Sequence, residues 1–186
     1  MGDNRMERNM NILAISGSLR KQSANTMLMQ AMIELAPATL NFQVYDQLND
    51  LPHFNPDFDV DDGPVSVQHF RSQLKQADGV LICTPEYGNG IPGVLKNALD
   101  WIVSSGEWVN KPTVVIAASP SPLGGNQAHT SILLTLNMIN AHILDDASFT
   151  IPYITMKINK QGAITDPDTK KALQDSLLRL AEARST

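Results

Sequence analysis

The chain has 186 residues and a formal net charge of −5 at pH 7, and 42% of its residues are hydrophobic. This length and composition suit one domain with a sizeable core, which we expect over residues 10–186 after a disordered tail at residues 1–9. The mild excess of acidic residues argues against nucleic acid or an anionic membrane surface as the main partner.

Short apolar runs alternate with helical periodicity along the chain. The run at 10–16 predicts a strand, and apolar side chains at helical spacing predict a helix over 25–36. A second strand at 41–45 precedes a long loop at 48–63 that is rich in proline, aspartate and asparagine. The later predicted elements are a helix at 65–77, a strand at 79–84, a helix at 92–103 with Pro92 as its first residue, a strand at 113–118, a helix at 125–140, a short strand within 142–151 and a helix at 168–183.

The alternation of strands and helices decides the fold class. Strands separated by helices of ten or more residues imply right-handed crossovers and a parallel sheet with helices on both faces. Five strands fit the flavodoxin-like order 2-1-3-4-5. The sequence therefore predicts an α/β fold, a flavodoxin-like three-layer sandwich built on a five-stranded parallel sheet. Ligands of such sheets bind in the crevice beyond the carboxyl ends of the strands.

The loop after the first predicted strand is rich in groups that bind phosphate. Free amides and the dipole at the start of the helix favour an anion, and Arg20 can add a forked contact. Helix capping alone would need only one such residue, Ser23 or Asn25. The loop has neither the GxGxxG fingerprint nor a GK[ST] ending, which favours the phosphate of a mononucleotide. The predicted phosphate-binding residues are Ser16, Ser18, Arg20, Ser23, Asn25 and Thr26.

The loop after the third predicted strand is suited to hold a flat ring. Gly88 and Gly90 let the main chain approach a heterocycle closely, and Tyr87 can pack on or beside it. Together with the phosphate loop, this segment indicates bound flavin mononucleotide (FMN). Within it, Glu86 is better explained by a structural or subunit-contact role than by acid–base catalysis. The predicted ring-binding residues are Pro85, Glu86, Tyr87, Gly88, Asn89 and Gly90.

Other potential sites carry weaker signals. A third loop at the same edge of the sheet carries Ser119, Gly124 and Gly125, where the serine can reach the ligand and the glycines permit close approach. Cys83 lies inside an apolar run and is expected to pack as a small apolar side chain. No cysteine or histidine cluster has the spacing of zinc ligands, so no metal site is predicted.

We expect no targeting segment in this sequence. Residues 1–9 have no apolar core of a signal peptide, and no apolar run is long enough to span a bilayer. We therefore expect a cytoplasmic protein that binds neither nucleic acid nor a membrane.

At the motifs of these three loops the chain resembles the NADPH-dependent FMN reductase family, a flavodoxin-like group with chromate, quinone and azo dye reductases. The matching motifs lie at 17–25, at 85–101 and at the pair Gly124 and Gly125. Two positions depart from the family pattern. Gly88 stands where the family often has asparagine, and Gln127 stands in a region where the family often has arginine.

The resemblance implies specific roles for the matching residues. Ser18, Arg20, Ser23 and Asn25 would hold the FMN phosphate, and residues 85–90 would line the isoalloxazine ring. Ser119, Gly124 and Gly125 would close the site. The resemblance also implies a homodimer or homotetramer with the flavin near a subunit boundary, to which the helix at 92–103 would contribute.

These observations favour an FMN-dependent oxidoreductase with a ping-pong cycle. NADPH or NADH would reduce bound FMN, and a small acceptor such as a quinone, free flavin, azo compound or chromate would then be reduced. No catalytic side chain is predicted, because the flavin carries the chemistry. The alternatives are a flavodoxin-type electron carrier and a flavin-sensing interaction module, since fold alone does not separate these functions.

Overall fold

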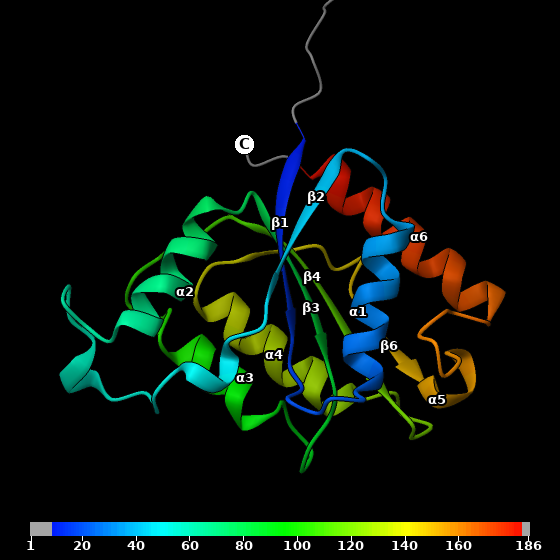
Figure 1. Cartoon of the computed structure of the whole chain (residues 1–186), viewed down its shortest axis with the longest axis horizontal. Coiled ribbons are helices and arrows are strands. Elements are labelled where there is room, and N and C mark those ends of the chain that lie inside the picture. Colours follow the sequence, from blue (N-terminus) through cyan, green and yellow to red (C-terminus); the bar gives the residue numbers. More distant parts are fainter. Residues whose placement is uncertain (1–8, 184–186) are drawn as a thin grey trace, which may run out of the picture.

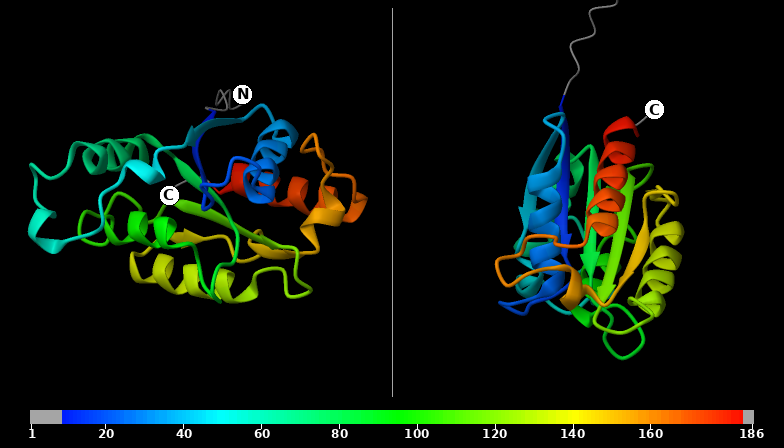
Figure 2. Two further views of the ribbon diagram at one scale, coloured as in Figure 1. Left: turned by 60° about the horizontal axis from the view of Figure 1, so that its bottom comes forward. Right: turned by 90° about the vertical axis from the view of Figure 1, so that its right-hand side faces the viewer.

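In the computed structural model, the described residues 9–183 form a twisted parallel sheet between two layers of helices (Figures 1 and 2). The strand order is β2-β1-β3-β4, and both β5 and β6 pair with β4. This order confirms the predicted flavodoxin-like sheet. The predicted tail at 1–9 lies outside the described residues apart from Asn9. The elements are β1 Met10–Ser16, α1 Ala24–Leu35, β2 Leu40–Tyr45, two short turns of 3₁₀ helix at Leu48–Asp50 and Pro56–Phe58, α2 Val65–Gln76, β3 Gly79–Thr84, α3 Gly93–Asp100, β4 Pro112–Ser119, α4 Asn126–Met138, β5 His142–Ile143, β6 Phe149–Pro152, α5 Ile154–Lys157 and α6 Pro167–Glu182.

Alternation along the strands divides the core into two apolar layers. On β1, Leu13 and Ile15 face α2, α3 and α4, whereas Ile12 and Ala14 face α1 and α6. All residues of β3 are buried, because this strand is covered on both faces. The crossovers that follow β1 and β3 therefore lie on opposite faces of the sheet, with α1 on one face and α3 on the other. This divergence opens a crevice at the carboxyl ends of β1 and β3.

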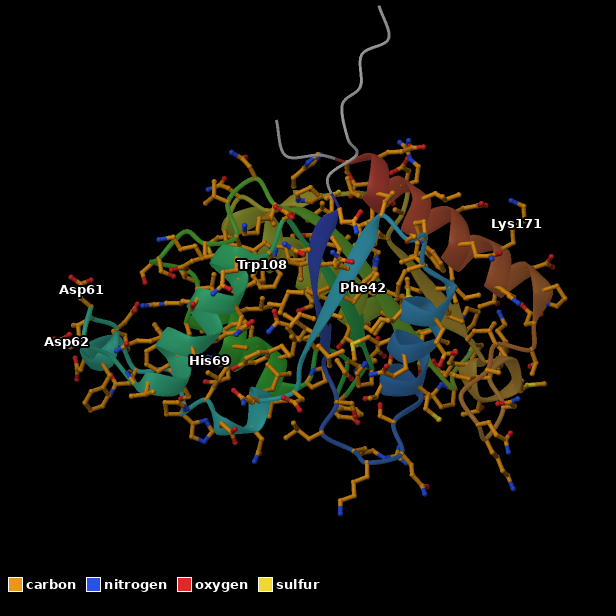
Figure 3. The ribbon with its side chains drawn as sticks, turned by 45° about the horizontal axis from the view of Figure 1, so that its top comes forward. Phe42, Asp61, Asp62, His69, Trp108 and Lys171 are labelled. Atoms are coloured by element: carbon orange, nitrogen blue, oxygen red, sulfur yellow. The ribbon has the colours of Figure 1, made fainter. Side chains whose placement is uncertain are left out.

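The long loop after β2 extends away from the sheet. Asp61 and Asp62 lie at the outer end of this loop (Figure 3). By contrast, Trp108, which follows α3, is buried inside the molecule. The start of the loop is fixed on α3 by Trp101, whose Nε1 donates to the Pro52 carbonyl at 2.9 Å. The predicted loop is thus present, with two short 3₁₀ turns inside it.

Two predicted elements differ from the observed ones. Pro92 is the N-cap of α3 and not its first residue, and the helix ends at Asp100 rather than near Val103. The single strand predicted within 142–151 is divided into β5 and β6, which occupy successive stretches beside β4. Between them the chain turns, and Ser148 Oγ accepts the N–H of Val115 at 3.0 Å. A side chain thereby replaces the missing ladder bond.

Candidate functional site

A pocket of about 290 Å³ opens beyond the carboxyl ends of β1, β3 and β4. Its walls come from the loops that follow these three strands, from the start of α1, and from α5 with the residues after it. This is the edge at which parallel sheets bind ligands. The predicted site residues that line it are Arg20, Ser23, Asn25, Pro85, Glu86, Tyr87 and Ser119.

The start of α1 presents polar groups to this pocket. Ser23 caps the helix and its Oγ accepts the N–H of Thr26 at 3.3 Å. Asn25 is 3% exposed and its Nδ2 donates to the Ala118 carbonyl at 2.9 Å, which ties the first loop to β4. Its Oδ1 is buried and has no hydrogen-bond partner among the described residues. Buried acceptors in folded proteins normally accept a hydrogen bond. A sugar-alcohol hydroxyl of a ligand in the pocket would donate one to Asn25 Oδ1.

The remaining hydroxyls of the first loop lie on the other side of it. Ser16 Oγ and Thr26 Oγ1 bond each other at 2.7 Å, and Ser18 Oγ lies 3.3 Å from the Tyr87 hydroxyl. Ser16, Ser18 and Thr26 line a neighbouring groove of about 610 Å³, and Arg20 lines both the groove and the pocket. The structure thus brings the predicted phosphate residues to one loop but distributes their side chains over its two sides.

The predicted ring loop forms a tight turn. The N–H of Tyr87 donates to the Gly90 carbonyl at 3.0 Å, and the N–H of Gly90 donates back at 3.2 Å. Gly88 and Asn89 between them have φ of 56° and 60°, as a type I′ turn requires. A Cβ added at Gly88 or Gly90 would meet nothing within 4 Å, and Tyr87 is 47% exposed. The backbone of this turn is therefore open to a flat ligand.

Glu86 links the ring loop to α4. Its Oε2 accepts the N–H of Gln127 at 2.8 Å and the N–H of Ala128 at 3.1 Å. The N-cap of α4 is Gly125, which has no side chain to cap the helix, so Glu86 supplies the cap from a distant segment. Its carboxylate is held by these amides, which explains why it is better suited to a structural role than to proton transfer.

The third loop contributes Ser119 and Pro120 to the pocket. Ser119 lines it, and its Oγ donates to Ser121 Oγ at 3.1 Å. Gly124 and Gly125 instead allow the chain to turn sharply before α4, with φ of 62° and 86°. A Cβ at Gly124 would lie 2.7 Å from the backbone nitrogen of Pro152. The positive φ of both residues, together with the close packing of Gly124 against β6, therefore accounts for these glycines without a ligand.

The wall formed by α5 and the turn that follows it was not predicted from the sequence. Residues of this segment that line the pocket are Ile154, Thr155, Ile158, Asn159 and Lys160. The sequence offers a turn signal here, an asparagine followed three residues later by Gly162. It does not reveal that this turn lies beside α1, because that contact depends on how the last crossover returns to the sheet.

The thiol of Cys83 is placed as a packing residue of the core. Cys83 is buried with its Sγ 3.9 Å from Met32 Sδ, and burial raises the pKa of its thiol far above the ordinary value. The prediction that it packs as an apolar side chain is confirmed.

Within residues 9–183, no group of three or more histidine, cysteine, aspartate or glutamate side chains could hold a metal. None of the helices in this part of the chain has the length and hydrophobicity needed to cross a membrane.

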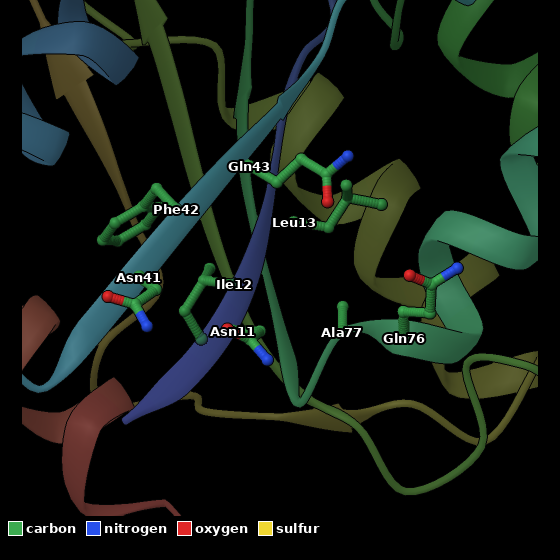
Figure 4. Close-up of a pocket in the computed structure, with 8 residues that line it drawn as sticks. All are labelled: Asn11, Ile12, Leu13, Asn41, Phe42, Gln43, Gln76 and Ala77. Atoms are coloured by element: carbon green, nitrogen blue, oxygen red, sulfur yellow. The ribbon is translucent and has the colours of Figure 1, made fainter. Parts of the chain in front are cut away.

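A further cavity of about 260 Å³ lies near the amino ends of β1 and β2 (Figure 4). Carboxamide side chains of Asn11, Asn41, Gln43 and Gln76 line it together with apolar residues. It is remote from the loops that carry Arg20 and Tyr87, and it lies at the opposite edge of the sheet from the crevice. The pocket at the carboxyl ends of β1, β3 and β4 is therefore the better candidate for the ligand-binding site.

The strand order and the polar pocket at the β1–β3 crevice define a flavodoxin-like, nucleotide-binding class of protein. Residues 10–155 match the model of the NADPH-dependent FMN reductase family. The chain belongs to this family. It is accordingly an NAD(P)H-dependent oxidoreductase of the FMN reductase and quinone reductase type, with FMN as its cofactor.

Individual relatives agree with the family assignment. A 2-hydroxy-1,4-benzoquinone reductase from Burkholderia sp is 34% identical over 166 residues, which cover 88% of this chain and 90% of that protein. A quinone reductase from Escherichia coli (strain K12) is 30% identical over 181 residues, covering 95% and 96%. The solved structure of FerB, a flavoenzyme NAD(P)H:(acceptor) oxidoreductase from Paracoccus denitrificans, superimposes with a TM-score of 0.80 at 32% identity, covering 93% of this chain and 96% of that one.

Proposed function

We propose that this protein is an NAD(P)H-dependent quinone reductase that works with FMN in the pocket at the carboxyl ends of β1, β3 and β4. The open turn at 87–90 beside this pocket carries the proposal, because a ring held there stays accessible to a second flat molecule. When bound, FMN supplies hydride transfer, alternately from NAD(P)H and to the acceptor. The quinones named in two of the relatives support the choice of acceptor.

The residues of the pocket divide the task of holding the cofactor. Arg20 and the amides at the start of α1 suit the phosphate, with Ser23 as the helix cap. The unpartnered Oδ1 of Asn25 suits a ribityl hydroxyl. The peptide groups of the turn at 87–90 suit the polar edge of the ring, and Tyr87 lies beside it. No side chain is assigned a proton-transfer role, because hydride transfer needs position and shielding rather than an acid–base pair.

We further propose a cytoplasmic dimer or tetramer. The cytoplasm is where an NAD(P)H-dependent enzyme meets its reductant. On the side of the molecule covered by α3 and α4, the side chains of Val103, Leu134 and Met138 are 44%, 68% and 56% exposed. Exposed apolar side chains of this kind suit contact with a second copy. Light scattering of the Leu134→Glu, Met138→Glu double variant would show a smaller particle than the wild type if this face mediates assembly, and an unchanged mass would contradict it.

Steady-state kinetics with NADPH and a benzoquinone test the proposal. If both substrates use one site in turn, double-reciprocal plots at several quinone concentrations are parallel. Intersecting lines would contradict the ping-pong cycle while leaving the reductase activity intact. The proposal as a whole fails if FMN binds to the protein but stays oxidised after anaerobic addition of NADPH, as expected for an electron carrier or a sensor.

A further inference from the structure

We propose that Lys160, in the turn after α5, is a second phosphate-binding cation and that, given the FMN role proposed above, it makes the pocket select FMN over unphosphorylated riboflavin. Lys160 lies outside the three loops that carry the family motifs. It lines the same pocket as Arg20 and Ser23, and it approaches from the opposite end of the chain.

The turn lies beside the first turns of α1. A Cβ added at Gly162 would lie 3.7 Å from the Cβ of Met27, which stands only four residues after the helix cap Ser23. Met27 and Lys160 both line the pocket. Both views in Figure 2 show the segment after β6 next to the amino-terminal end of α1. Lys160 is thereby brought to the end of α1 at which free amides and the helix dipole favour an anion.

The backbone of the turn is fixed by its own hydrogen bonds. Asn159 Oδ1 accepts the N–H of Gln161 at 3.0 Å and the N–H of Ala163 at 2.9 Å. The N–H of Asn159 donates to the Ala163 carbonyl at 3.0 Å, and Ile158 is buried at 8% exposure. Lys160 therefore projects from a rigid base, which reduces the entropy lost when its side chain contacts a ligand.

The charge of a bound phosphate also requires a second cation. A phosphate monoester carries a charge of about −1.5 to −2 at pH 7, and Arg20 supplies only one positive charge. Among the described residues that line the pocket, Arg20 and Lys160 are the only ones with a cationic side chain. No carboxylate within residues 9–183 forms an ion pair with Lys160. The carboxylate of Glu86 is engaged by the amides of α4, so Lys160 is available for the phosphate.

Lys157 provides a matched control in the same segment. It is three residues before Lys160 and does not line the pocket. Its charge acts instead on Asp166, whose pKa is lowered mainly by hydrogen bonds from Thr169 and to a smaller extent by Lys157. Lys157→Ala therefore removes an equal charge from nearby without removing it from the pocket.

The test is titration of apoprotein with FMN and with riboflavin, followed by quenching of flavin fluorescence. We expect Lys160→Ala to weaken FMN binding by roughly 10- to 100-fold, within the range of a charge-assisted hydrogen bond, and to leave riboflavin binding unchanged. Lys160→Arg should retain most of the FMN affinity, and Lys157→Ala should match the wild type for both flavins. Added salt should reduce the difference between Lys160→Ala and the wild type.

The other outcomes overturn the inference in distinguishable ways. Unchanged FMN affinity in Lys160→Ala, or an equal loss for both flavins, would remove Lys160 from the phosphate site while the proposed reductase function stands. Equal loss in Lys157→Ala and Lys160→Ala would reduce the effect to general surface charge. A wild-type protein that binds neither flavin would overturn the proposed function together with this role of Lys160.

Discussion

The carboxylate of Glu86 accepts the backbone N–H of Gln127 at 2.8 Å, across 41 residues of sequence. This bond joins the loop after β3, which lines the pocket, to the first turn of the helix after β4. The ring loop therefore does not stand alone. Its position is set by the amino-terminal end of α4.

Replacing Glu86 by alanine should destabilise the protein by about 1–2 kcal/mol, because the first amides of α4 lose their acceptor. Glu86→Gln should cost less, since a carboxamide oxygen still accepts a hydrogen bond. Urea unfolding of the apoproteins measures both effects. If the two variants were equally stable, the capping role of the carboxylate would be refuted.

Arg20→Ala should weaken FMN binding by about 1.5–3 kcal/mol, the usual contribution of a hydrogen bond to a charged group. The unfolding free energy of the apoprotein should change little, because no side-chain hydrogen bond or ion pair of Arg20 is seen among the described residues. Fluorescence titration gives the affinity. Lys170→Ala, on the outer surface of α6, is the control, and unchanged FMN affinity in Arg20→Ala would exclude Arg20 from the site.

Gly124→Ala should destabilise the fold by about 2–4 kcal/mol. The new Cβ would meet the backbone of β6 at 2.7 Å, and φ of 62° is unfavourable for alanine. Gly93→Ala is the matched control, because a Cβ there meets nothing within 4 Å and α3 gains helix propensity. Thermal unfolding should separate the two variants clearly. Similar melting temperatures would show that the close approach to β6 relaxes at little cost.

The buried side chain of His129 should make the stability of the protein depend on pH. Burial lowers the pKa of His129, against the smaller opposing effects of a backbone hydrogen bond with Val115 and of Asp145. Between this lowered pKa and the ordinary value of about 6.5, the unfolded chain binds more protons than the folded one. The stability gained by burying neutral His129 is thus present above about pH 6.5 and is lost as the pH falls towards the folded pKa.

Unfolding free energies of the wild type and His129→Gln at pH 8 and pH 5 test this expectation. The wild type should lose more stability between these pH values than the variant does. Parallel losses would show that His129 is accessible to protons in the folded state.

The central part of the fold could be predicted because its signals are local. Three strands, β1, β3 and β4, are continuous apolar runs, and the helices between them have clear periodicity. The division between β5 and β6 was not predicted, because the turn that separates them is stabilised by a hydrogen bond from Val115 of β4 to the side chain of Ser148. The end of α3 was misplaced because turns continue the same apolar spacing beyond Asp100.

For the site, the sequence predicts which loops meet at one edge of the sheet, but it does not predict the contacts between their side chains. The strand order alone brings the loops of Arg20 and Tyr87 together, and the turn at 87–90 follows from its glycines. The side-chain partners of Ser16 and Glu86 depend on distances between separate segments, which no local pattern specifies. Gly17 is a similar case, because a Cβ there would meet Thr84 Oγ1 on another strand at 2.6 Å.

The division of the last strand also affects how the molecule behaves among its copies. An uninterrupted strand beside β4 would expose a long row of unpaired peptide groups, which can recruit strands of other chains. Here that margin is covered by pieces of two and four residues, displaced from each other by the turn that carries Ser148. Neither piece offers a template long enough for edge-on pairing, so the break protects this side of the sheet against aggregation.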